Sequence, residues 1–224
     1  MIGMEVTHLG HSCLVVDTPD ARILIDPGTL APTWETVTDI DAVLITHAHA
    51  DHVDWDRLPA LLAENPAAAL YFEPELAASE DAKNWTAKPL PAGASATVGD
   101  VTVEAVGGQH AVIHGDVPRI GNVGFVLRQK GGPTLFHPGD SYETAAKGVD
   151  VLAVPLNAPW GAVKEAIDFT RAVAPRVAIP IHDGLLSDAG RATYLRLLRS
   201  QGGRDGAELY ILDLASAGTT SVDA

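Results

Sequence analysis

One short stretch constrains this chain more than any other, because four side chains that can bind a metal ion fall within six residues: His47, His49, Asp51 and His52. The stretch follows residues 41–45 (DAVLI), an apolar run that predicts a buried strand. Loops that leave the C-terminal end of such a strand are where α/β proteins place their sites. Imidazole and carboxylate suit Zn²⁺ and related divalent ions, so a metal site is a better interpretation than a solvated polar loop.

The composition limits the classes to which the chain can belong. A chain of 224 residues, 46% hydrophobic and 20% charged, is expected to form a globular α/β domain. No apolar run approaches the ~20 residues that span a bilayer, and the N-terminus lacks the basic and apolar regions of a signal peptide. Cys13 is the only cysteine, which excludes an internal disulfide framework and agrees with a cytoplasmic location.

The net charge of −14 bears on the partners. A field of this sign repels polyphosphate backbones, so a nucleic-acid groove is disfavoured. A small anionic substrate stays compatible, because bound dications would reverse the sign locally.

The pattern of apolar runs and turn residues predicts two αβ halves without a strong linker, and therefore a single domain over residues 1–224. In the first half, strands are expected over residues 4–9, 12–17, 22–26, 41–45 and 68–72, with helices over residues 54–64 and 74–82. In the second half, a strand over residues 101–106 and a hairpin over 124–137 precede strands 149–156, 176–181 and 208–212 and helices 162–174 and 188–201. Residues 215–224 are small and polar and are expected to be a frayed tail.

Three further metal-capable side chains stand at the ends of predicted strands: His110, Asp140 and His182. Taken singly, each is equally well explained as a capping Asp or a surface His. Together with the cluster they indicate a site at one edge of a sheet. His114, four residues after His110, is an alternative ligand or a pocket residue, and His110 is preferred because it comes nearest the strand end.

Other polar residues are candidates for supporting roles. His11, in a Gly-His-Ser turn, is expected either to line the pocket or hydrogen-bond a ligand, or to be structural. His137 is expected in the core or behind the ligands. Asp26 and Asp183 are candidate hydrogen-bond partners of the ligands, although turn capping is the simpler account of both.

With these residues the chain resembles the metallo-β-lactamase-fold hydrolases. Residues 46–52 (THAHADH) match the His-x-His-x-Asp-His signature without a gap, and His110, Asp140 and His182 follow in the order that the family uses. Residues 6–12 and 24–27 are similar to the branch of ascorbate-6-phosphate lactonase-like metal-dependent hydrolases. The resemblance covers nearly the whole chain and implies a four-layer αββα sandwich with the metals at one edge.

The resemblance also implies roles for the ligands. The first ion would be held by His47, His49 and His110, the second by Asp51, His52 and His182, with Asp140 bridging them. Two imidazoles at i and i+2 can chelate from an extended turn, which agrees with this division. In a two-metal site a bridging hydroxide is the nucleophile, and Asp51 would orient it and relay its proton. Two divalent ions per chain are expected, with Zn preferred over Mn or Fe for a His-rich set.

These expectations favour a dinuclear hydrolase of a small ester, lactone or phosphodiester metabolite. One alternative is a di-iron oxidoreductase on the same fold, although His49 stands where the iron redox proteins carry Glu. Another is a non-catalytic metal-binding module, although none of the seven ligands is missing. The expected partner is a small molecule, with no nucleic acid and no membrane, and related enzymes often form oligomers. Substrate identity is expected to depend on the loops 31–39 and 111–121.

Overall fold

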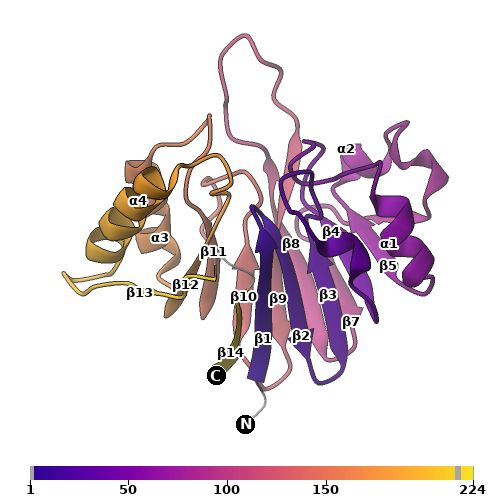
Figure 1. Cartoon of the computed structure of the whole chain (residues 1–224), viewed down its shortest axis with the longest axis horizontal. Coiled ribbons are helices and arrows are strands. Elements are labelled where there is room, and N and C mark those ends of the chain that lie inside the picture. Colours follow the sequence, from indigo (N-terminus) through magenta and orange to yellow (C-terminus); the bar gives the residue numbers. More distant parts are fainter. Residues whose placement is uncertain (1–2, 215–217, 224) are drawn as a thin grey trace.

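The computed structural model describes residues 3–214 and 218–223, and it shows two β-sheets packed face to face with helices on both outer faces (Figure 1). Each sheet has seven strands among the described residues. This arrangement confirms the predicted αββα sandwich.

The first sheet has the strand order β14-β1-β2-β3-β4-β5-β6. Strands β1 to β3 form an antiparallel meander, and β3 to β6 run parallel to one another. The strands are β1 (Gly3–Gly10), β2 (Cys13–Thr18), β3 (Ala21–Ile25), β4 (Ala42–Ile45), β5 (Ala69–Phe72), β6 (Ala87–Pro89) and β14 (Thr219–Asp223). The helical segments that go with this half are η1 (Trp34–Thr36), α1 (Leu58–Glu64), α2 (Pro74–Ala77) and η2 (Ala82–Asn84).

The second sheet has the order β13-β12-β11-β10-β9-β8-β7. Strands β7 to β10 are antiparallel, and β10 to β13 are parallel. The strands are β7 (Ser95–Val98), β8 (Val101–Gln109), β9 (Gly121–Gln129), β10 (Thr134–His137), β11 (Val151–Pro155), β12 (Val177–Ile181) and β13 (Tyr210–Ile211). Helices α3 (Val163–Val173) and α4 (Asp188–Gln201) cover its outer face.

The central strands are buried on both faces, which explains their unbroken apolar sequences. In β4, Ala42 and Leu44 point into the core between the two sheets, whereas Val43 and Ile45 pack in a second core under α1. A third core lies between the second sheet and helices α3 and α4. Successive side chains of a strand point to opposite faces, so one apolar run supplies two layers of the sandwich.

The structure corrects three expected boundaries, and the first is that of the helix expected over residues 74–82, which ends at Ala77. The helix predicted from residue 54 begins at Leu58, because Asp54 Oδ1 accepts the N–H groups of Asp56 and Arg57 in a preceding turn. The tail expected to fray is ordered over residues 219–223, where β14 pairs with β1 and satisfies the backbone groups at the sheet edge. Residues 215–217 and 224 of that tail lie outside the described residues.

The candidate ligands follow the ends of β4, β8, β10 and β12, and the β1–β2 turn lies beside them at the same edge of the sandwich. The loop between β8 and β9 projects beyond this edge (Figure 1). Within the described ranges, no helix has the length and apolar character that crossing a membrane requires.

Candidate metal centre

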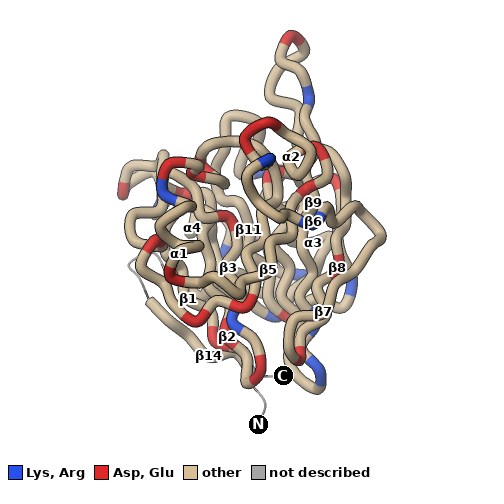
Figure 2. Tube along the Cα trace, turned by 90° about the vertical axis from the view of Figure 1, so that its right-hand side faces the viewer, with Lys and Arg blue, Asp and Glu red and all other residues tan. Residues whose placement is uncertain are grey.

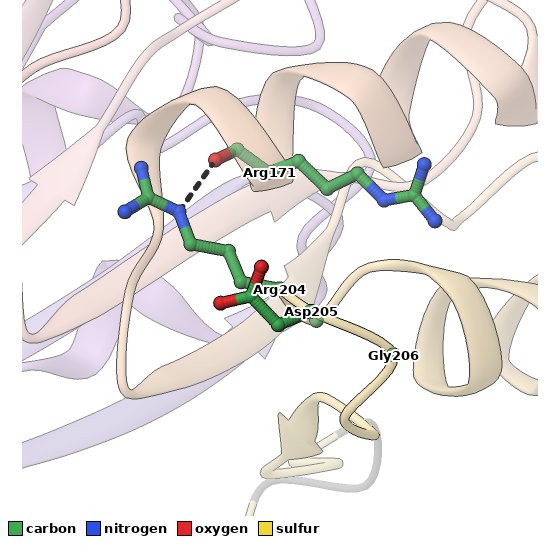
Figure 3. A pocket seen from close by; sticks show the side chains of 5 residues that line it. Arg171, Arg204, Asp205 and Gly206 are labelled. Atoms are coloured by element: carbon green, nitrogen blue, oxygen red, sulfur yellow. Dashed lines mark hydrogen bonds between the residues drawn. The ribbon is translucent and has the colours of Figure 1, made fainter.

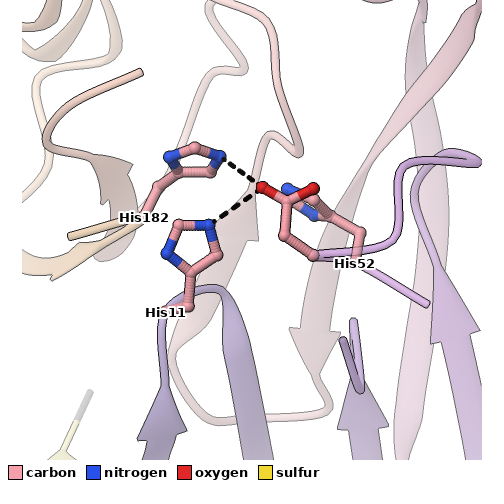
Figure 4. Close-up of side chains that lie close together, drawn as sticks. His11, His52 and His182 are labelled. Carbon is pink, nitrogen blue, oxygen red and sulfur yellow. Dashed lines mark hydrogen bonds and ion pairs between the residues drawn. The ribbon is translucent and has the colours of Figure 1, made fainter. Parts of the chain in front are cut away.

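Eight side chains converge in two adjoining clusters. In each cluster the potential ligand atoms lie within 4.8 Å of one another. The first cluster contains His47, His49, His110 and Asp140, and the second contains His11, Asp51, His52 and His182. Asp140 joins the two, because its Oδ2 lies 3.4 Å from His110 Nε2 and 3.2 Å from His182 Nε2. Figure 4 shows the second cluster, with His11 and His182 directed at one carboxylate.

The structure therefore brings together all seven residues predicted as ligands, and His11 with them. The alternative, His114, lies on the projecting loop with 69% of its side chain exposed, and its Nδ1 accepts the N–H of Asp116. Among the described residues it belongs to neither cluster. Metal binding by the seven residues stays a prediction.

A buried carboxylate behind the clusters orients His52. Asp26 is fully buried, and it accepts hydrogen bonds from the Thr46 N–H at 2.8 Å, the Thr46 hydroxyl at 2.7 Å and His52 Nδ1 at 2.7 Å. The ring of His52 is thereby turned so that Nε2 lies 3.0 Å from Asp140 Oδ1. Asp26 thus supports a candidate ligand, and the simpler account of its side chain as a turn cap is wrong.

Two other histidines are oriented in the same way. His110 Nδ1 donates to the Ala111 carbonyl at 2.6 Å, and His182 Nδ1 donates to the Asn157 carbonyl at 2.6 Å. Backbone and carboxylate acceptors of this kind fix the tautomer of metal-ligating histidines.

The inward atoms of these residues have the character of metal ligands. Among the described residues, the buried Nε2 atoms of His52, His110 and His182 have no hydrogen-bond partner of good geometry, although oxygens of Asp140 lie 3.0–3.4 Å from them. In the first cluster, His47 Nε2 and His49 Nδ1 lie 3.1 Å apart. Buried polar atoms without partners are costly, and a divalent cation between them would satisfy imidazole and carboxylate lone pairs together. The residues fit a metal centre.

The protonation states of these residues also agree with a metal centre. Burial opposes ionisation of Asp51, but hydrogen bonds from His11 and His182 outweigh it and hold the pKa of the Asp51 carboxyl below its usual range. Burial lowers the pKa of His47 well below its usual value, so this ring is neutral. At His182 burial also acts to lower the pKa, but the neighbouring carboxylates of Asp140 and Asp51, 3.2 and 3.4 Å from Nε2, outweigh it and raise the pKa to about 9. The metal-free centre therefore holds at least one proton that an incoming cation must displace.

Close backbone contacts hold the loops of the centre in place. A Cβ on Gly28 would lie 1.9 Å from the carbonyl oxygen of Asp51, so only glycine lets the loop after β3 pack against the cluster. Gly139, with φ of +62°, turns the chain toward Asp140. Asn122 fixes that turn, since its Oδ1 accepts the Asp140 N–H at 2.9 Å and its Nδ2 donates to the Pro138 carbonyl at 3.0 Å.

Trp160 is a site residue that the sequence analysis missed. Its indole Nε1 donates to Asp140 Oδ2 at 2.8 Å, and its ring centroid lies 6.0 Å from that of His110 and 6.3 Å from that of His182. The ring of Tyr142 packs against the Trp160 ring, with 4.8 Å between their centroids. Trp160 follows β11 in an irregular segment, so no periodicity or motif connects it with the centre.

Two of the candidate supporting residues direct their side-chain hydrogen bonds to groups other than the ligand side chains. His137 is buried and donates from Nε2 to the Ser12 carbonyl at 2.9 Å, while its Nδ1 accepts the Gly139 N–H at 3.2 Å. Asp183 accepts from Arg191 Nε at 2.6 Å and so binds helix α4 rather than a ligand.

A cavity of about 570 Å³ adjoins the second cluster at His11. Small-molecule sites have volumes of about 300–1,000 Å³. The apolar part of its lining includes Leu30, Pro32 and Leu186, and the polar part includes Asp183 and Arg191.

A second hollow, of about 590 Å³, lies between the C-terminal ends of α3 and α4, at the other end of these helices from the clusters. The guanidinium groups of Arg171 and Arg204 point away from each other there (Figure 3). Arg204 Nε donates to the Arg171 carbonyl at 3.3 Å, and the two cations do not converge on one ligand.

Comparisons with known proteins agree with this geometry. Residues 5–182 match a family model described as "Beta-lactamase superfamily domain". Protein Rv0786c of Mycobacterium tuberculosis is 44% identical over 192 residues, covering 85% of this chain and 89% of that protein. A UPF0173 metal-dependent hydrolase of Carboxydothermus hydrogenoformans is 30% identical over 193 residues, covering 80% of this chain and 84% of the relative.

Solved structures show the same fold. Igni18, a metallo hydrolase from the archaeon Ignicoccus hospitalis, matches with a TM-score of 0.75 at 19% identity, covering 99% of both chains. The metallo-beta-lactamase fold protein YhfI from Bacillus subtilis matches with a TM-score of 0.74 at 16% identity, covering 99% of this chain and 100% of that chain.

Proposed function

The chain belongs to the beta-lactamase superfamily and is a metal-dependent hydrolase, and we propose that it cleaves a small ester, lactone or phosphodiester metabolite with two divalent ions. The observation that carries the proposal is the position of Asp140 between the clusters, with one oxygen within 3.4 Å of histidine nitrogens on both sides. A single carboxylate so placed suits a pair of ions about 3.5–4 Å apart, the spacing of two-metal hydrolases.

We assign the ligands by cluster. His47, His49 and His110 would hold one ion, Asp51, His52 and His182 the other, and Asp140 would bridge them. When bound, the ions would supply a hydroxide nucleophile at neutral pH and polarise the scissile bond. The His-rich donor set favours Zn²⁺, with Mn²⁺ and Fe²⁺ as alternatives.

The two carboxylates of the centre differ in accessibility, and this difference assigns their roles. The Asp140 side chain is 3% exposed and is held by Trp160, whereas the Asp51 side chain is 26% exposed. Asp51 is the one that a bound substrate can reach. We therefore assign to the ionised Asp51 the relay of a proton, accepted from the nucleophile and passed to the leaving group, which general acid–base catalysis requires at hydrogen-bond distance.

The surroundings favour a small substrate. The cavity beside His11 has the volume of a metabolite site. Figure 2 shows Lys and Arg scattered among more numerous Asp and Glu, and a net charge of −14 disfavours nucleic acid. Lactone hydrolysis and phosphodiester hydrolysis are the preferred activities. Lactone hydrolysis is preferred because residues 6–12 and 24–27 are similar to those of ascorbate-6-phosphate lactonase-like enzymes. A cytoplasmic location is proposed on the single, buried Cys13.

The alternatives are less well supported. A di-iron oxidoreductase would favour a carboxylate where His49 stands in the first cluster. A non-catalytic module would be expected to have lost ligands, and all seven lie in the two clusters.

The test is hydrolysis of a panel of lactones, esters and phosphodiesters by the Zn- or Mn-loaded protein and three variants. His49→Ala and Asp51→Ala are expected to keep the circular dichroism of the wild type and to lose at least about 100-fold in turnover. His114→Ala, which removes an exposed histidine outside both clusters, is the matched control and should retain activity. Undiminished turnover in both His49→Ala and Asp51→Ala would refute the proposal.

A further inference from the structure

His11 comes from the β1–β2 turn, yet it is embedded in the second cluster. Its side chain is fully buried, and its Nε2 lies 3.1 Å from Asp51 Oδ2 (Figure 4). Its ring centroid is 4.0 Å from that of His182. By distance alone, His11 qualifies as a further metal ligand beside Asp51 and His182.

The directions of its hydrogen bonds exclude that role. The backbone N–H of Gly184 donates to His11 Nδ1 at 3.2 Å. A ring nitrogen that accepts a hydrogen bond carries no proton, so the neutral imidazole of His11 has its proton on Nε2. Nε2 therefore faces Asp51 as an N–H donor and has no lone pair to offer a cation.

The neighbouring histidines have the opposite tautomer. His52 Nδ1 donates to Asp26 Oδ2 at 2.7 Å, and His182 Nδ1 donates to the Asn157 carbonyl at 2.6 Å. Each of them can turn an unprotonated Nε2 toward an ion. Within one cluster, then, His52 and His182 can each offer an Nε2 lone pair once a cation displaces the proton from that atom, whereas His11 keeps its N–H toward Asp51.

We infer that His11 is a positioning residue that donates its Nε2–H to Asp51 and holds that carboxylate in place without binding a metal ion. The inference rests on the proposed function, since it concerns how Asp51 is placed to act there. Asp51 lies on a loop and is partly exposed, so without this donor its carboxylate could turn toward solvent.

The backbone around His11 fixes the donor. Its carbonyl accepts the His182 N–H at 2.8 Å and His8 Nε2 at 2.8 Å, and its φ of +50° lies in the left-handed region. A Cβ on Gly184 would approach His11 Nδ1 to 3.0 Å, so glycine allows the amide to come close. The turn of one sheet is thus tied to the end of β12 in the other, and a flipped ring would lose the Gly184 bond.

The direct test is the protonation pattern of His11 in the Zn-loaded, ¹⁵N-labelled protein, read from long-range proton–nitrogen correlations and assigned by their loss in His11→Gln. We expect a proton on Nε2 and none on Nδ1. A proton on Nδ1 together with an unprotonated Nε2 would overturn the inference, because that pattern belongs to a ligand.

Two variants supply an independent readout. His11→Phe keeps an aromatic ring without a donor, whereas His11→Gln can return an N–H near the position of Nε2. Both are expected to bind as many ions per chain as the wild type, with apparent affinity reduced about 10–100-fold in His11→Phe and largely recovered in His11→Gln. One ion fewer in both variants, or no recovery by Gln, would contradict the positioning role.

These outcomes separate the inference from the proposed function. A wild-type protein that binds no metal would refute the metal-dependent function itself. Two ions in the wild type and one in the His11 variants would leave that function standing and refute only the role of His11. If His11→Phe fails to fold, the wild-type spectrum and the metal content of His11→Gln still test the role of His11.

Discussion

Replacing Asp26 by Asn tests whether a buried carboxylate outside the ligand set governs metal affinity. Asp26 accepts three hydrogen bonds, two from Thr46 and one from His52. An Asn side chain keeps one oxygen for the Thr46 N–H and turns its NH₂ toward His52 Nδ1–H and the Thr46 hydroxyl. Donor then faces donor, which favours transfer of the His52 proton to Nε2, the atom that points into the centre.

The expected loss follows from this contact. Removing the partner that orients a metal-ligating histidine costs about 10–100-fold in affinity, which is about 1.4–2.7 kcal/mol at about 1.36 kcal/mol per decade. Competition with a chromophoric chelator would measure the Zn²⁺ affinity of the wild type and of Asp26→Asn. The matched control is Asp41→Asn just before β4, where the carboxylate accepts one exposed backbone N–H from Arg22 at 2.7 Å. An Asp26→Asn affinity within threefold of the wild type would refute the reasoning.

Three further outcomes are expected. Because the pKa of His182 is raised to about 9 in the metal-free protein, its contribution to stability is complete below about pH 6.5 and is lost as the pH rises through 9. Thermal melts across this range measure the loss of stability, and the release of protons on Zn²⁺ binding at pH 7 measures the protonation of the metal-free centre. Paramagnetic Co²⁺ should quench tryptophan emission, and Trp160→Phe should remove most of the quenching while Trp85→Phe does not, since Trp160 contacts Asp140. Truncating the fully buried Leu44 to Ala should lower the free energy of unfolding by about 2–5 kcal/mol, against about 0.5 kcal/mol or less for the exposed Leu185.

The parts of the fold that the sequence predicts are those with a local cause. The strand before the cluster is buried on both faces, so its apolar run is unbroken and visible. The stretch from His47 to His52 is contiguous, so its metal-binding character needs no tertiary knowledge. His110, Asp140 and His182 each follow a predicted strand. This repeated order is enough to predict that the ligands meet at one edge of the sandwich.

The parts that escaped prediction depend on contacts between distant segments. Trp160, in the segment after β11, and Asn122, in β9, contact Asp140 only because the second sheet brings these segments beside the end of β10. Asp26 precedes a Pro-Gly pair and has the local sequence of a turn, and only the folded chain shows that its oxygens contact Thr46 and His52. β14 is short and polar, and it becomes a strand because β1 offers an unpaired edge.

The measurement that tests the central claim most directly is the metal content per chain, by inductively coupled plasma mass spectrometry, on protein purified without added metal and again after reconstitution. Two clusters joined by Asp140 predict two Zn or Mn ions per chain. A chain that binds no metal even after reconstitution with Zn²⁺ or Mn²⁺ would mean that the seven ligands do not hold metal, and the hydrolase mechanism would fall with them.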